Sequence, residues 1–130
     1  MNCRIKIVFL WLLTICGLSC HSITDLLPIF WRKDLSVFVS DACFYQSMII
    51  CMMSITFLIP SCGIISVIYD FSGKCMRYVN LVLATLIALF NLFHAFKELP
   101  SDITAQYIIL PLLILIGILL FVQSFKFVKE

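Results

Sequence analysis

The chain has 130 residues, of which 63% are hydrophobic and 12% charged, and its formal net charge is +2. A soluble domain carries about 25% charged residues, so this composition excludes an ordinary water-soluble fold and indicates a membrane protein. The small net charge and the absence of a basic cluster in the sequence also exclude nucleic acid as a partner.

Four long stretches of the sequence contain no charged residue. They are Ile7–Thr24, Ala42–Tyr69, Tyr78–Phe96 and Ile103–Phe125. Since a helix rises about 1.5 Å per residue and the hydrocarbon core of a bilayer is about 30 Å thick, each stretch is long enough to cross it. The sequence therefore predicts an all-α fold: an integral membrane four-helix bundle. We expect one domain of residues 1–130, with spans at about 5–24, 43–69, 78–97 and 103–125.

The first stretch has features of a targeting signal. Arg4 and Lys6 precede an apolar run that ends at Gly17-Leu18-Ser19-Cys20, which resembles a secretory or lipoprotein signal. Apolar character continues past His21 to Phe30, so we expect a retained first helix, with cleavage as the alternative.

The connection that follows predicts a short helix at the membrane surface. Pro28 is expected to follow the first span, and Trp31-Arg32-Lys33 is typical of an interfacial anchor. Leu35, Phe38 and Val39 have helical i, i+3, i+4 spacing, which indicates an amphipathic interfacial helix in the first outer loop.

The second stretch is too long for an upright span, because 28 residues cover about 42 Å. Pro60 is expected to kink this helix, since proline removes one backbone donor. Serine recurs every seventh residue, which predicts a face that packs into the bundle. The serines are Ser40, Ser47, Ser54 and Ser61.

Helical periodicity also predicts which faces of the other spans turn inward. On the third helix the inward set is Asn80, Ala84, Ile87, Asn91, His94 and Ala95, and the set expected to face lipid is Val82, Leu86, Leu89, Phe93 and Phe96. On the fourth helix the inward set is Gln106, Gly117 and Ser124, and on the first it is Cys16, Gly17, Cys20 and Thr24. The short second and third connections predict that the last three helices are antiparallel neighbours.

Three polar side chains are expected near the same membrane surface. His21 ends the first span, and Asn91 and His94 end the third. We expect them to form hydrogen bonds with one another or with water. The alternative is a ligand site, such as a haem or a metal held by the two histidines.

No catalytic motif and no C-x-x-C motif occurs among the seven cysteines. We therefore assign no catalytic residue, no metal and no cofactor.

The distribution of basic residues predicts the orientation. The N-terminus, the second connection and the C-terminus hold six of the nine lysines and arginines. Basic residues are retained in the cytoplasm, so both termini are expected there. The six are Arg4, Lys6, Lys74, Arg77, Lys126 and Lys129, and the other three are Arg32, Lys33 and Lys97.

Three short segments resemble a group of small bacterial four-helix membrane proteins that are DoxX-like in layout and uncharacterised in function. The segments are Asp25-Leu26-Leu27-Pro28, Ile59-Pro60 and Arg77-Tyr78-Val79-Asn80. The resemblance implies a four-helix bundle in a bacterial inner membrane and brings no established activity.

The sequence as a whole predicts a multi-pass inner-membrane protein that acts through helix–helix contacts, as an accessory, immunity-type or oligomer-forming subunit. Its expected partners are the lipid bilayer and a second copy or another membrane protein. Two alternatives remain: a redox or ligand-binding protein that uses His21, Asn91 and His94, and a small transporter that works as an oligomer.

Overall fold

A computed structural model describes residues 2–30, 42–69, 74–98 and 106–130. Every element within these ranges is helical, and the described residues include no strand. The elements are α1 (Cys3–Phe30), α2 (Ala42–Met53), the π-helix η2 (Ser54–Leu58), α3 (Ile59–Ile68), α4 (Lys74–Glu98) and α5 (Gln106–Lys129).

Four of the helical segments are long and apolar enough to cross a membrane. They are Cys3–Thr24, Ile49–Ile68, Lys74–Glu98 and Tyr107–Lys129. The predicted all-α, four-helix membrane fold is therefore confirmed. The predicted interfacial helix lies outside the described residues.

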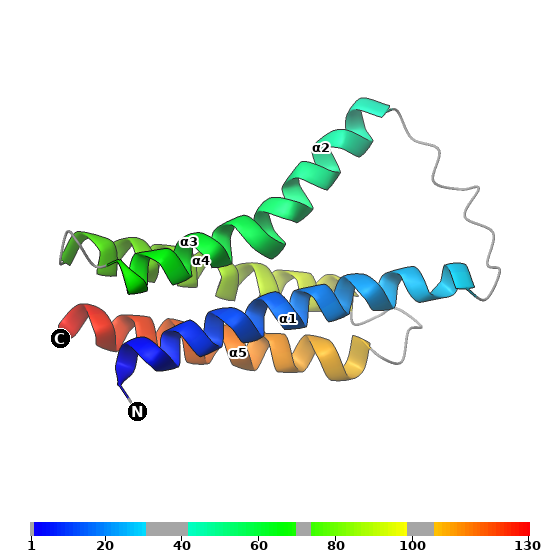
Figure 1. Ribbon diagram of the computed structural model, residues 1–130. Coiled ribbons are helices and arrows are strands. Elements are labelled where there is room, and N and C mark those ends of the chain that lie inside the picture. Colours follow the sequence, from blue (N-terminus) through cyan, green and yellow to red (C-terminus); the bar gives the residue numbers. More distant parts are fainter. Residues whose placement is uncertain (1, 31–41, 70–73, 99–105) are drawn as a thin grey trace.

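The helices form a four-sided bundle in which each packs on two neighbours. α5 packs on α1 and α4, and α3 packs on the same two helices. α1 and α4 therefore lie on one diagonal of the bundle, and both run from the end that holds the chain termini (Figure 1). We call this the terminal end, and the end where α4 stops and α5 starts the opposite end.

α4 has the predicted orientation. Five of its six expected inward residues are buried, and His94 is partly buried. All five residues expected to face lipid are exposed, Phe93 by 73%. Such exposure of large apolar side chains suits a helix whose outer face meets hydrocarbon. On α5, Gly117 and Ser124 are buried as predicted.

The second span bends away from the bundle. η2 ends at Leu58, two residues before Pro60, and α2, on the N-terminal side of η2, diverges from the other helices (Figure 1). A π turn combined with a proline is a recognised cause of a kink, so the predicted bend is present. In the described part of the chain, the only extensive contacts of α2 are with η2.

The serine repeat of this span does not form the predicted inward face. Ser47 is exposed, and Ser54 and Ser61 are only partly buried, whereas Ser66 is buried. The π turn adds one residue to the helical repeat, which breaks the seven-residue phase between Ser54 and Ser61. Ser40 lies outside the described residues.

α1 differs from expectation in its length and in its inward face. The helix extends six residues past Thr24 and includes Pro28, which membrane helices tolerate. Cys16 and Cys20 are exposed, and Gly17 and Thr24 are only partly buried. The buried residues recur at alternating spacings of four and three, and they are Ile7, Trp11, Thr14, Leu18 and His21.

Candidate functional site

Near the terminal end, buried hydrogen bonds join three helices. The indole N–H of Trp11 donates to Oδ1 of Asn80 at 2.9 Å, and the Asn80 amide donates to Oγ of Ser124 at 2.8 Å. All three side chains are fully buried. A buried amide is costly unless it is paired, and here both halves of the amide have partners. We call Trp11, Asn80, Ser124 and Gly63 the tryptophan cluster.

Gly63 brings the fourth helix into this cluster. A Cβ atom placed on Gly63 would lie 2.7 Å from Nε1 of Trp11 and would overlap the six-membered part of the indole. The ring therefore rests directly on the α3 backbone. Small residues permit this kind of close approach between membrane helices. The tryptophan cluster thus contains one residue from each of the four spans.

Near the opposite end, the two histidines meet across the bundle. Nε2 of His21 lies 2.6 Å from Nε2 of His94, and the rings are edge-on, with centroids 4.6 Å apart and planes at 79°. His21 is 98% buried, and the His94 ring stacks on Phe90 at 5.3 Å. The predicted meeting of His21 and His94 is therefore present, and we call them the histidine pair.

The geometry of the histidine pair is that of a hydrogen bond. One Nε2 carries the hydrogen and donates it to the lone pair of the other. Two histidines that share one zinc ion have Zn–N distances of about 2.0–2.1 Å, which places their nitrogens about 3.3 Å apart. The distance of 2.6 Å between the two Nε2 atoms is shorter than that. Among the described residues, no group of three or more His, Cys, Asp or Glu side chains gathers as metal ligands do.

A small cavity lies beside the histidine pair, where α1 and α4 meet the second span. Its volume is about 10 Å³, which is room for about one water molecule and far less than a haem needs. Ser22 and Thr56 contribute hydroxyl groups to its lining, and Met52 and Ile55 contribute apolar ones. The cavity thus lies close to the point where α2 leaves the bundle.

Asn91, the third predicted residue, lies in the interface of α4 with α5. Its amide nitrogen donates to the Leu113 carbonyl oxygen at 3.1 Å, and its side chain is 98% buried. Within the described part of the chain, Oδ1 of Asn91 has no hydrogen-bond partner. The structure joins the two histidines directly and records no hydrogen bond between them and Asn91.

Trp11 is the main residue that the sequence analysis missed. In the sequence Trp11 is one residue of an apolar run, and the cysteine pattern predicts a different inward face for the first helix. Cysteine behaves as a small apolar residue and marks no face reliably. The signal was a pair of seven-residue repeats: Ile7, Thr14 and His21 are seven residues apart, and so are Trp11 and Leu18.

Comparison of the chain with protein-family models, with curated proteins and with solved structures gave no match.

Proposed function

We propose that this protein is a multi-pass membrane protein that acts through helix–helix contacts, as an accessory, immunity-type or oligomer-forming subunit without catalytic activity. The observation that supports this proposal most is the divergence of α2 from the bundle. Helix association in a bilayer depends on van der Waals packing and hydrogen bonds between helices, so a helix that diverges from its own bundle presents a surface on which a helix of another molecule can pack.

The surface of α2 suits a second helix. Ile50 and Met53 are 67% and 60% exposed, and Ser47 is exposed as well. Ser47 and Ser54 are seven residues apart and lie before the π turn has shifted the phase, so they share one face. Small hydroxyl residues at this spacing allow close packing between membrane helices. The serine repeat therefore supports packing on a partner rather than within the bundle.

The native cysteines supply a test of this proposal. Cys51 on α2 and Cys16 on α1 are both exposed. One variant would keep Cys51 and a second would keep Cys16, with every other cysteine replaced by serine. In native membranes, oxidative crosslinking should join Cys51 to a second copy or to another membrane protein, and Cys16 should give a much weaker product.

The outcomes are distinct. A crosslinked product of twice the monomer mass supports an oligomer-forming subunit, and a product of another mass supports an accessory or immunity role. If Cys51 stays monomeric under conditions that crosslink Cys16, α2 is not the contact surface and the proposal fails.

We also propose a bacterial inner membrane as the location, with both termini in the cytoplasm. The support is the distribution of charge: six lysines and arginines lie at the terminal end of the bundle, while Lys97 lies at the opposite end. Alkaline phosphatase fused after Glu130 should be inactive, because it would stay in the cytoplasm, and a fluorescent protein at the same point should be bright. An active phosphatase fusion would show that the C-terminus lies outside the cytoplasm, which is the opposite orientation.

A ligand-binding or redox function is the alternative, and it is favoured by Oδ1 of Asn91, which has no hydrogen-bond partner among the described residues. This buried acceptor lies within one helical turn of His94 and would suit a small donor such as water. An absorption spectrum and a metal analysis of the purified protein test the alternative. A visible band that disappears in His94→Ala would support it, and a colourless, metal-free protein would exclude its haem and metal forms.

A transporter would need several copies, so exclusively monomeric protein in the crosslinking experiment would count against it.

A further inference from the structure

A groove on the outside of the bundle runs along the start of α1 and the end of α3. Its volume is about 260 Å³, near the lower end of the range of about 300–1,000 Å³ for small-molecule clefts. The α1 residues that line it extend from Arg4 to Leu12, a rise of about 12 Å. Val67 and Ile68 form the wall contributed by α3.

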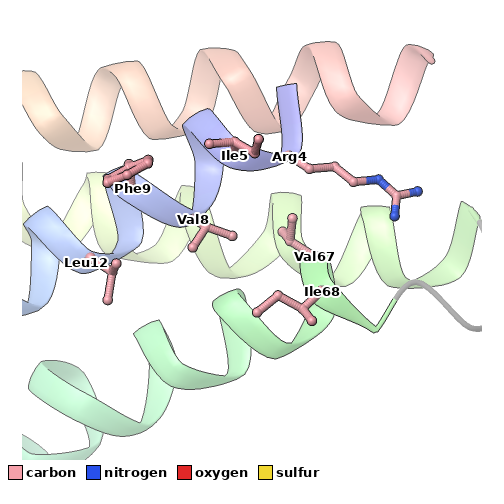
Figure 2. A pocket seen from close by; sticks show the side chains of 7 residues that line it. All are labelled: Arg4, Ile5, Val8, Phe9, Leu12, Val67 and Ile68. Carbon is pink, nitrogen blue, oxygen red and sulfur yellow. The ribbon is translucent and has the colours of Figure 1, made fainter. Parts of the chain in front are cut away.

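The groove is apolar except at one end. Ile5, Val8 and Leu12 line it on α1, and among its described lining residues Arg4 alone is charged. Figure 2 shows the Arg4 guanidinium at one end of the groove, directed away from Leu12 at the other. An apolar groove with a guanidinium group at one end matches a molecule that has a hydrocarbon chain and an anionic head.

The charge around Arg4 is reinforced by a second helix. The guanidinium carbon of Arg4 lies 5.4 Å from the centroid of the Phe127 ring, and that of Arg77 lies 4.9 Å from the same centroid. Arg77 also donates to the Phe127 carbonyl oxygen at 3.4 Å. Two guanidinium groups are therefore held beside one buried ring at the terminal end.

We infer that this groove binds one anionic phospholipid, with an acyl chain along α1 and α3 and the headgroup phosphate at Arg4. A guanidinium group matches a phosphate with two parallel hydrogen bonds, and basic pockets between membrane helices recognise anionic headgroups. The groove faces the bilayer, where phospholipid is the most abundant amphiphile. This inference is independent of the proposed helix contact, because it concerns a different surface and needs no partner.

Native mass spectrometry of the full chain in detergent tests the inference. The probes are dioleoylphosphatidylglycerol and dioleoylphosphatidylcholine, which share acyl chains and differ in headgroup charge. The wild-type protein should bind the anionic lipid more tightly. Arg4→Gln should lower that preference by about fivefold, the effect of one basic residue near a lipid surface. Glycerol 3-phosphate, which has no acyl chain, should not displace the bound lipid.

Two further variants separate a built site from diffuse attraction. Lys129→Gln removes the same charge from the terminal end but not from the groove, and it should leave the preference unchanged. Ile68→Trp, which places a bulky ring in the groove, should weaken binding of both lipids. The inference is overturned if the wild type shows no preference, if Lys129→Gln and Arg4→Gln have equal effects, if glycerol 3-phosphate displaces the lipid, or if Ile68→Trp changes nothing.

Discussion

The tryptophan cluster and the histidine pair join the same two diagonal helices, α1 and α4, in different ways. In the cluster, the Trp11 N–H and both halves of the Asn80 amide are paired, and Gly63 packs against the indole. Beside the histidine pair there is a small cavity, α2 diverges, and Asn91 retains an unpartnered buried oxygen within the described residues. The polar atoms of the first region are paired with one another, whereas the second region includes a buried acceptor with no partner among the described residues.

The largest effect is expected from truncation of Trp11, the aromatic anchor of the tryptophan cluster. Trp11→Ala removes a fully buried indole and leaves the Asn80 oxygen unpaired, so we expect a loss of about 3–5 kcal/mol in the free energy of unfolding. The measurement is unfolding in mixed micelles by graded denaturant. Phe9→Ala, on the exposed side of the same helix, is the matched control and should change little. Equal losses in the two variants would contradict the assignment of the cluster as the core.

The two asparagines of α4 should respond unequally to leucine. Asn80→Leu leaves the Trp11 N–H without its acceptor and should cost about 1–3 kcal/mol. Asn91→Leu removes one hydrogen bond but also an oxygen that has no partner among the described residues, so its cost should be at least about 1 kcal/mol smaller. The same unfolding measurement compares them. A larger effect at Asn91 would show that its oxygen has a partner in the membrane.

The histidine pair should show coupling between its two members. His94→Phe leaves a buried His21 nitrogen without this partner and should cost about 1 kcal/mol. Replacement of both histidines by phenylalanine should cost less than the two single changes together, since apolar side chains then face each other. A double-mutant cycle measures this term. Strict additivity would mean that the observed 2.6 Å contact contributes no energy.

The smallest effects are expected on α2. Ile50→Ala and Met53→Ala should each change the stability of the isolated monomer by no more than about 0.5 kcal/mol, because both side chains are mostly exposed. In native membranes the same changes should reduce crosslinking through Cys51. A clear loss of monomer stability would place α2 against the bundle and remove the contrast between the two regions.

The inward face of α4 could be predicted from the sequence because its asparagines and alanines differ sharply from its phenylalanines. The meeting of His21 with His94 followed from their similar depth. The face of α1 could not be found in this way, since cysteine polarity misled and tryptophan looks like any other apolar residue in a membrane span. Only its hydrogen bond to Asn80, across a diagonal, reveals its role.

The second span shows a different limit of sequence reasoning. Pro60 indicates a kink in the sequence. The π turn before it also changes the helical phase, and no residue type predicts such a turn. The serine repeat was therefore extrapolated across a break in register. The extension of α1 through Pro28 has a similar cause: proline permits a membrane helix to continue when the freed carbonyl is satisfied elsewhere.

The two diagonal contacts have a mechanical consequence. Trp11–Asn80 and His21–His94 connect α1 and α4 at two different heights, so one helix cannot slide or rotate past the other without breaking both. The bundle of α1, α3, α4 and α5 is therefore expected to move as one rigid block. We expect the second span to bend at η2, because the π turn and the nearby Pro60 interrupt the regular pattern of backbone hydrogen bonds. The protein thus consists of a rigid four-helix bundle and one helix, α2, that is hinged at η2, and this hinge lies beside the cavity at the histidine pair.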